Sequence, residues 1–171
     1  MRQLFKEISL DFKFNKYKLR IRLLLFLFRL CNYFNNSYLK IIFLPFFVFY
    51  RFYSEWICSV ELRPGTKIGA PLIIDHGYGI VINKNAELGD SVHIRHGVTI
   101  GVRNNKQELD KVSPKIGNNV SIGCNSSILG NISIGDNVFI GAHSLILNSI
   151  NKNSKVFLDI NLKLRTKLEK I

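Results

Sequence analysis

Between residues 115 and 147 an isoleucine returns at every sixth position. The members of this series are Ile116, Ile122, Ile128, Ile134, Ile140 and Ile146. Glycine directly follows four of them, and Val120, Ile132 and Val138 lie two positions before the next isoleucine. This period fits neither the turn of an α-helix nor the alternation of a strand, and it predicts a parallel β-helix whose coils stack around one core. We expect each isoleucine to point inward and each glycine to lie at a corner where a Cβ would strain the turn.

The same register extends toward the N-terminus in two parts, separated by a slip of two residues. The inward positions are Leu62, Ile68, Ile74 and Ile80, followed by Ile82, Leu88, Ile94 and Ile100. Each part carries a histidine two residues after an inward isoleucine: His76 follows Ile74, and His96 follows Ile94. With the slip, both histidines occupy equivalent places on adjacent coils, about 4.8 Å apart. We therefore expect two imidazoles on one face of the β-helix.

A longer interruption separates Ile100 from Ile116, where the spacing is sixteen residues. The intervening segment has mixed charge and almost no periodicity, so we predict a loop extruded from the β-helix at residues 102–115. Long loops on a rigid scaffold are places where binding residues collect.

The first 58 residues show no such register and predict a helical, basic and aromatic-rich region. We expect two helices, at residues 14–33 and 37–58, with Asn35 and Asn36 between them. Pro45 lies within the second helix and is expected to kink or split it, because proline removes a helical hydrogen bond.

Two apolar runs in this region, 23–28 and 41–50, are shorter than the about 20 residues of a membrane-spanning helix, and we predict none. A signal peptide is not expected either, since the first run follows a long charged stretch. Two interpretations stay open. In one, the helices bury against the β-helix or against copies in an oligomer; in the other, their Phe and Leu side chains enter a lipid interface beneath basic residues, and both can hold together. These basic residues are Lys16, Lys18, Arg20 and Arg22.

The composition of the chain limits which classes of binding partner are expected. With 171 residues, 47% of them hydrophobic, the chain has the size of one domain with an ample core. The formal charge of +12 is spread along the chain without a nucleic-acid motif, so anionic ligands or a membrane surface are better partners than nucleic acid. Cys31, Cys58 and Cys124 are an odd number without metal-ligand spacing, which predicts no metal site and favours a reducing cytoplasm.

Two long stretches carry a family resemblance. They read Ile74-Asp-His-Gly-Tyr-Gly-Ile-Val-Ile-Asn-Lys-Asn85 and Ile94-Arg-His-Gly-Val-Thr-Ile-Gly101. Together with the six-residue repeats, they make the chain similar to the hexapeptide-repeat acyltransferases. Within that family the chain resembles serine acetyltransferases and, more closely, acetyltransferases of the colanic acid type. The resemblance covers roughly residues 55 to 150.

The resemblance implies a mainly β fold, a left-handed parallel β-helix of hexapeptide repeats with a short α-helical N-terminal region and a C-terminal helical tail. We expect the helical region at 1–58, the acyltransferase β-helix at 59–150 and the tail at 151–171. The family also implies a homotrimer with active sites between subunits. The short N-terminal region makes the further assembly of serine acetyltransferase trimers into hexamers unexpected here.

Acetyl transfer from a thioester to an alcohol needs a base that titrates near neutrality, which suits histidine. By resemblance, His76 is this general base and Glu61 matches the carboxylate that orients it. Asp75 lines the acceptor pocket, although it would otherwise be a routine turn residue. His96 binds the acceptor or shares the catalytic role, with a structural role as the alternative. His93 and His143 are expected to be structural or merely exposed, as solitary histidines usually are.

The resemblance also implies acetyl-CoA as co-substrate, bound in a groove between neighbouring β-helices. Gly101, Cys124 and Ala142 match the positions whose backbone contacts the pantetheine, although small residues are also needed at the corners. The basic side chains of the tail meet the coenzyme's phosphates or form a solvated face. These side chains are Lys163, Arg165 and Lys167.

The end of the predicted loop bears on the acceptor. Serine acetyltransferases place an arginine and a histidine there to hold a carboxylate, whereas this chain has Val112 and Ser113. Valine cannot bind a carboxylate, so free serine is a poor candidate. We expect a cytoplasmic O-acetyltransferase acting on a hydroxyl of a bacterial surface polysaccharide (capsule, exopolysaccharide or O-antigen) or its precursor, with peripheral association at the inner face of the cytoplasmic membrane left open. The alternatives are a serine O-acetyltransferase and a non-catalytic β-helix scaffold or binding protein.

Overall fold

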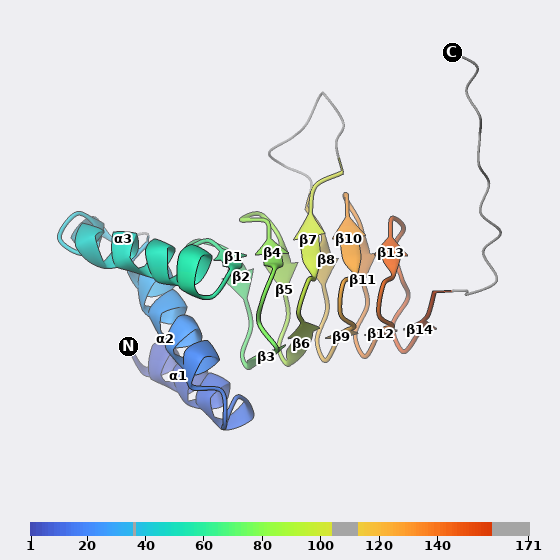
Figure 1. Ribbon diagram of the computed structural model, residues 1–171, viewed down its shortest axis with the longest axis horizontal. Coiled ribbons are helices and arrows are strands. Elements are labelled where there is room, and N and C mark those ends of the chain that lie inside the picture. Colours follow the sequence, from blue (N-terminus) through green and yellow to red (C-terminus); the bar gives the residue numbers. More distant parts are fainter. Residues whose placement is uncertain (36, 104–112, 159–171) are drawn as a thin grey trace, which may run out of the picture.

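The computed structural model describes residues 1–35, 37–103 and 113–158. Over these residues the chain forms a parallel β-helix with α-helices packed at the end of its first coil (Figure 1). The predicted fold, a mainly β, left-handed parallel β-helix with N-terminal helices, is confirmed. The predicted C-terminal helix and its basic side chains Lys163, Arg165 and Lys167 lie outside the described residues.

The described strands form three parallel sheets, one on each side of the coil. Sheet A contains β1 (Val60–Leu62), β4 (Ile80–Ile82), β7 (Thr99–Gly101), β10 (Ser127–Leu129) and β13 (Leu145–Ile146). Sheet B contains β2 (Lys67–Ile68), β5 (Glu87–Leu88), β8 (Lys115–Ile116) and β11 (Ser133–Ile134). Sheet C contains β3 (Leu72–Asp75), β6 (Val92–Arg95), β9 (Ser121–Ile122), β12 (Phe139–Ile140) and β14 (Lys155–Val156). The chain visits the sheets in the repeated order A, B, C, which explains the six-residue period.

The inward isoleucines stack in register, as the repeat predicts. In sheet C, for example, Ile74 pairs with Ile94, Ile94 with Ile122, and Ile122 with Ile140, and all four are fully buried. The slip of two residues lies between β3 and β4, in the turn that contains residues 76–79. The turn that begins at His76 is therefore longer than the corresponding turn of the next coil, which begins at His96.

The glycines that follow the isoleucines are needed for a different reason from the one expected. A Cβ at Gly117 would lie 2.9 Å from the backbone nitrogen of Asp136 on the next coil and 2.9 Å from the carbonyl carbon of Gly135. Left-handed backbone occurs two residues later instead, at Asn119 (φ 56°) and Asn137 (φ 58°). The expectation of turn strain at the glycines is wrong, because it is the close approach of successive coils that excludes a side chain there.

The N-terminal region contains more helices than expected. They are α1 (Arg2–Phe14), α2 (Leu19–Phe34), the 3₁₀ turn η1 (Tyr38–Lys40), α3 (Leu44–Phe52) and the π-helical turn η2 (Tyr53–Ile57). Helix α1 was not predicted, and of its residues only Leu4 and Asp11 are buried. Pro45 does split the second predicted helix, because α3 begins there. Proline is tolerated in the first turn of a helix, where a backbone N–H would have no partner within the helix.

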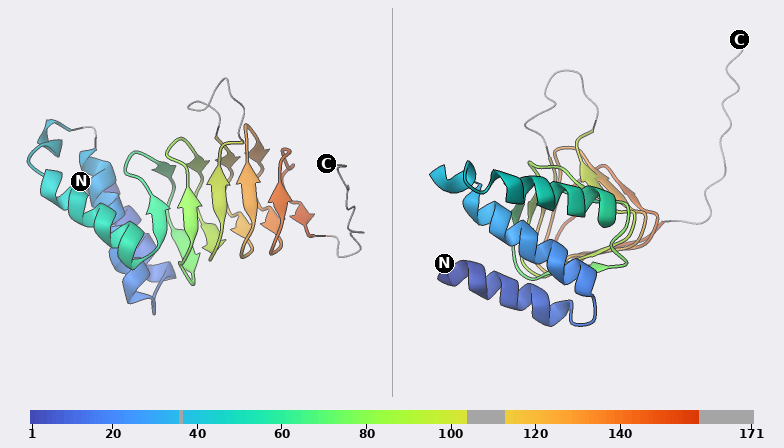
Figure 2. Two further views of the ribbon diagram at one scale, coloured as in Figure 1. Left: turned by 45° about the horizontal axis from the view of Figure 1, so that its top comes forward. Right: turned by 60° about the vertical axis from the view of Figure 1, so that its left-hand side comes forward.

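Polar side chains of α1 and the following turn cover the open edge of β3. Asp11 Oδ1 accepts a hydrogen bond from the Leu72 amide (2.8 Å), and Asn15 Oδ1 accepts one from the Ile74 amide (3.1 Å). The Asn15 amide nitrogen also donates to the Leu72 carbonyl at 2.9 Å. These groups take the place of a preceding coil, so that buried backbone N–H and C=O groups keep partners. The view along the coils shows the helices lying across this end (Figure 2).

Arg29 of α2 completes this cover. Its side chain is about 1% exposed, forms an ion pair with Asp11 (Nε to Oδ2, 2.8 Å), and donates to the carbonyls of Ile68 and Gly69, both at 2.7 Å. A buried ion pair is retained at low energetic cost only when further hydrogen bonds satisfy its remaining donors and acceptors, as they do here.

The helices and the β-helix share one hydrophobic core. Leu24, Leu25 and Phe28 of α2 are fully buried in the same cluster as the inward isoleucines. The packing interpretation of the 23–28 run is therefore confirmed for these side chains, and the lipid interpretation stays a prediction for exposed side chains such as Leu23. No helix among the described residues is long and apolar enough to cross a membrane.

Replacement of Gly117 by alanine should destabilise the β-helix by about 1–3 kcal/mol, because the new methyl group forces two coils apart. Gly101→Ala is the matched control, since a Cβ there would meet only Leu129 Cδ2, at 3.9 Å. Urea unfolding of both variants followed by circular dichroism measures the difference. Equal stability of the two variants would contradict the steric explanation.

Candidate active site

His76 and His96 lie one above the other at the corner between sheets C and A. The pairing of Asp75 with Arg95 places the next residues, the two histidines, in equivalent positions on adjacent coils. Their ring centroids are 6.0 Å apart and the rings are nearly perpendicular, at 79°. The predicted pair of imidazoles on one face is confirmed.

The backbone at His76 is tightly turned. Its φ of 50° lies in the left-handed region, and its carbonyl accepts a hydrogen bond from the Tyr78 amide at 2.7 Å. A Cβ at Gly77 would lie 2.6 Å from Ile21 Cδ1, which shows that α2 packs directly on this turn. The His76 side chain is exposed and makes no hydrogen bond within the described residues. An unusual backbone held by its surroundings is common at functional sites, and here it presents a free imidazole to solvent.

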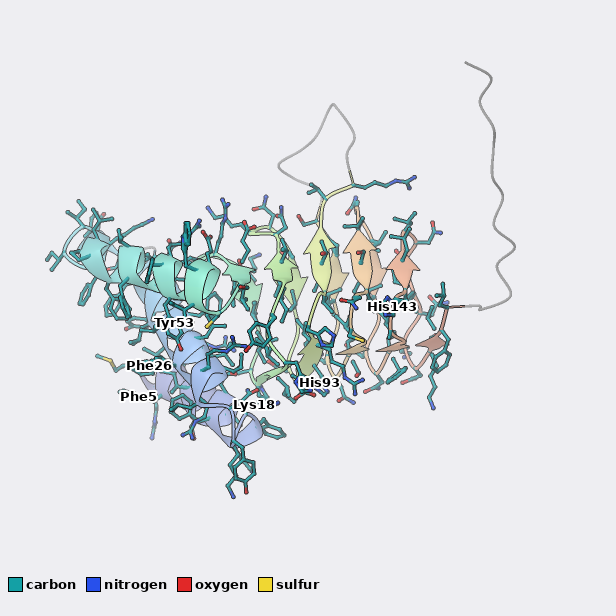
Figure 3. All side chains as sticks on the ribbon, viewed as in Figure 1. Phe5, Lys18, Phe26, Tyr53, His93 and His143 are labelled. Carbon is teal, nitrogen blue, oxygen red and sulfur yellow. The ribbon has the colours of Figure 1, made fainter. Side chains whose placement is uncertain are left out.

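Asp75, beside His76, is held by two partners. Lys18, from the start of α2, donates to Asp75 Oδ1, and His93 Nε2 lies 2.5 Å from Oδ2. Figure 3 shows that Lys18 comes from the helical end and His93 from the β-helix. Burial acts to raise the pKa of the Asp75 carboxyl, but hydrogen bonds and charge from Lys18 and His93 outweigh it and lower that pKa below its ordinary value.

The sequence did not indicate either partner of Asp75. His93, expected to be structural or exposed, is half-buried and bonded to a residue of the candidate site. The six-residue register could have suggested this contact, because it pairs Ile73 with His93 and so places His93 on the coil next to Asp75. Lys18 carried no signal, since it lies 57 positions from Asp75 outside the repeats. His143 is exposed on a later coil, as expected.

Glu61 does not contact the imidazole of His76 in the described structure. Its Oε1 is 2.9 Å from Arg63 Nη2 and accepts a second hydrogen bond from Nε at 3.1 Å. Both side chains are partly exposed. The orienting role of Glu61 therefore stays a prediction that would require its carboxylate to leave Arg63.

His96 has an unsatisfied ring nitrogen. Its Nδ1 is buried and has no hydrogen-bond partner among the described residues. Buried polar atoms in folded proteins nearly always have a partner, so one from outside this chain is expected, such as a water molecule, a substrate or a second copy.

A surface pocket of about 470 Å³ opens beside the His76 turn. It is lined by residues 17–21, where α2 begins, and by residues 75–78, where β3 ends. Its size is within the range typical of small-molecule sites. The predicted acceptor residue Asp75 and the predicted base His76 both line this pocket.

The predicted coenzyme residues occupy two corners. The register of Ile94, Ile122 and Ile140 places Cys124 and Ala142 in the same column as His96, one and two coils further along. Gly101 lies at the other end of sheet A, where β7 ends. A Cβ would fit at Gly101. The alternative explanation, that a corner of the β-helix needs a small residue, therefore does not apply to this glycine. A single chain therefore brings Cys124 and Ala142, but not Gly101, to the histidines.

The predicted loop falls between β7 of sheet A and β8 of sheet B, and its residues 104–112 lie outside the described residues. Ser113, at its far end, is buried, and its hydroxyl donates to Asn83 Oδ1 at 3.0 Å. Val112 lies outside the described residues. Among the described side chains, no group of His, Cys, Asp and Glu residues could hold a metal ion.

Comparison with known proteins relates this geometry to a family. Residues 113–148 match the family model of bacterial transferase hexapeptide (six repeats). The chain is 43% identical over 90 residues to a putative colanic acid biosynthesis acetyltransferase, WcaB, of Escherichia coli K12, covering 53% of this chain and 54% of that protein. It is 47% identical over 81 residues to a serine acetyltransferase of Staphylococcus epidermidis, covering 47% and 37% respectively.

The fold is also similar to a solved structure. The crystal structure of serine acetyltransferase isoform 3 from Entamoeba histolytica, in complex with cysteine, matches with a TM-score of 0.75 and 26% identity over 96% of this chain and 62% of that one. The chain spans about half, or less, of the length of the curated relatives it matches.

Asp75→Asn should lower the free energy of unfolding by about 1 kcal/mol at pH 7, because it removes the partly exposed ion pair with Lys18 and weakens the contact with His93. Folding lowers the pKa of Asp75, so its ionised form stabilises the fold above the ordinary pKa and this contribution is lost as pH falls through the lowered one. The difference from wild type should thus shrink below about pH 4. Urea unfolding of Asp75→Asn, Lys18→Met and the double variant measures it, and strictly additive effects at pH 7 would contradict the pairing.

Proposed function

We propose that this chain is a member of the hexapeptide-repeat transferase family and an O-acetyltransferase that moves an acetyl group from acetyl-CoA to a hydroxyl of a bacterial surface polysaccharide or its precursor. The observation that carries the proposal is an exposed imidazole, His76, on the wall of a pocket, with the His96 ring 6.0 Å away. Both relatives described above are named as acetyltransferases, which supports the acetyl group as cargo. A non-catalytic scaffold would have no need for a strained, solvent-facing histidine in a pocket.

In the reaction, His76 accepts the proton of the acceptor hydroxyl as its oxygen attacks the thioester carbonyl carbon. The carbon–sulfur bond then breaks, an oxygen ester forms, and the proton passes to the departing coenzyme A sulfur. Atoms balance without any metal or redox partner. His96, with its unsatisfied Nδ1, is placed to bind the acceptor or to stabilise the carbonyl oxygen on which negative charge develops.

The acceptor is proposed to be a sugar rather than serine. An amino acid needs a free carboxylate for its ammonium group, and the carboxylate of Asp75 already pairs with Lys18 and His93. At the position where the resemblance expects a cation for the amino acid's carboxylate, this chain has Ser113, a buried neutral residue. Serine acetyltransferase is the second candidate, because serine acetyltransferases are among both the sequence relatives and the structural matches.

Acetyl-CoA fits best between two copies of the chain. The column that contains His76, His96, Cys124 and Ala142 offers small side chains beside the imidazoles for an extended pantetheine. Gly101 lies at the opposite end of sheet A and cannot join the same site within one chain. A neighbouring copy could supply it, which supports a homotrimer with active sites between subunits.

We also propose a cytoplasmic location, where acetyl-CoA is available and the described cysteines remain free. Peripheral membrane association would use the outer face of α3 and η2 instead of the buried 23–28 run. This face exposes Val48, Phe49, Phe52 and Trp56. The first sixty residues carry ten Lys or Arg against three acidic residues, a balance that suits an anionic lipid surface. Co-sedimentation with anionic vesicles at low salt tests this location, and no binding would remove it.

Replacement of His76 by alanine should lower acetyl transfer by about 10²-fold or more, because a positioned base is lost. His143→Ala is the matched control, since it removes an exposed histidine of the same left-handed conformation (φ 57°) elsewhere on the β-helix. Thiol release from acetyl-CoA, measured with surface glycans and with serine, reports the rate. Unchanged turnover in a folded His76→Ala variant would overturn the base assignment, and efficient formation of O-acetylserine would favour the second candidate.

A further inference from the structure

We infer that the pocket beside His76 recognises an anionic sugar, whose carboxylate or phosphate group binds Arg20 while its ring lies against Tyr78. The inference rests on the proposed function and adds the chemical class of the acceptor. Both residues line the pocket, Arg20 from the first turn of α2 and Tyr78 from the turn that follows His76.

Arg20 is held in place without a carboxylate partner. Its guanidinium carbon lies 3.7 Å from the centroid of the Tyr78 ring, and its Nη2 donates to the Gly77 carbonyl at 3.1 Å. No Asp or Glu pairs with it among the described residues, in contrast to Arg29, which pairs with Asp11 and Glu7. A guanidinium that is already ordered loses little entropy on binding, and its remaining N–H donors suit the two oxygens of a carboxylate or phosphate.

The charge balance of the pocket favours an anion. Lys18 and Asp75 neutralise each other, and the second carboxylate oxygen of Asp75 is 2.5 Å from His93. Arg20 is then the unpaired charge on the pocket wall. A cationic acceptor would find no free carboxylate there, whereas an anionic one meets an unpaired guanidinium that is partly shielded from water.

Aromatic side chains provide a surface for a sugar ring. Tyr78 is 56% exposed although Arg20 covers one of its faces, and Tyr17 on the opposite wall is 89% exposed. Such rings combine a broad apolar face with a hydroxyl that can hydrogen-bond, which suits the mixed surface of a carbohydrate. A sugar bound here has its hydroxyls beside His76, so the binding group and the acceptor hydroxyl belong to the same molecule.

The beginning of α2 adds to the positive character of this wall. No side chain caps the helix, and its first turn contains no acidic residue. The free N–H groups of that turn contribute partial positive charge. This contribution is secondary to the guanidinium and does not make a site alone.

The test is direct binding, which does not depend on acetyl transfer. Calorimetry compares a glucuronate-containing tetrasaccharide, its carboxyl-reduced form and glucose 1-phosphate, each at millimolar concentration. We expect one or both anionic probes to bind the wild type, the neutral form to bind at least tenfold more weakly, and Arg20→Gln to remove about tenfold in affinity for the anions. Arg22→Gln is the control, because Arg22 stacks on Phe12 outside the pocket and should leave binding unchanged.

Three outcomes would overturn the inference. They are equal binding of the neutral and anionic tetrasaccharides, binding of none of the probes, and a weaker affinity of Arg20→Gln for coenzyme A alone, which would assign Arg20 to the coenzyme's phosphates. These outcomes leave the role of His76 in acetyl transfer intact. Conversely, a wild type without acetyltransferase activity could still bind an anionic sugar. The two proposals therefore fail separately.

Discussion

The exposed backbone edge of the first coil is the constraint on which the rest of the structure depends. Each later coil finds hydrogen-bond partners on the coil before it, but β3 has no preceding strand. Buried backbone groups without partners would destabilise the core, and an open edge would also invite pairing with other chains. The side chains of Asp11, Asn15 and Arg29 solve both problems by acting as a preceding strand. This explains why a carboxylate, Asp11, is one of the two buried residues of α1.

The same cover builds the candidate site. Asp11, Asn15 and Lys18 bond in order to successive backbone groups of β3, and Lys18 reaches the Ile74 carbonyl and Asp75 at its end. The line of contacts therefore fixes where α2 begins, and with it the positions of Lys18 and Arg20 beside His76. In this protein the N-terminal helices close the β-helix and also form one wall of the pocket.

Sequence periodicity could predict the part of this arrangement that repeats. Ile74 and Ile94 share a register, so the slip between them was enough to bring His76 and His96 together. The reason for Gly117 was misjudged, because the period reveals that a side chain is excluded but not which atoms exclude it. Helix α1 and the Lys18 to Asp75 pair were missed, since they depend on contacts between residues far apart in sequence. The expected pairing of Glu61 with His76 came from resemblance, and Arg63 lies nearer to Glu61 in this chain.

Amide hydrogen exchange at Leu72 and Ile74 tests the central claim, that side chains replace the missing coil, most directly. The account predicts that both amides exchange slowly in the wild type, like the coil-to-coil amides of Ser121 and Gly123. In Asn15→Ala, exchange at Ile74 should accelerate markedly while Ser121 and Gly123 stay protected. Exchange of Leu72 and Ile74 at the rate of an unfolded chain in the wild type, or no change at Ile74 in the variant, would contradict it.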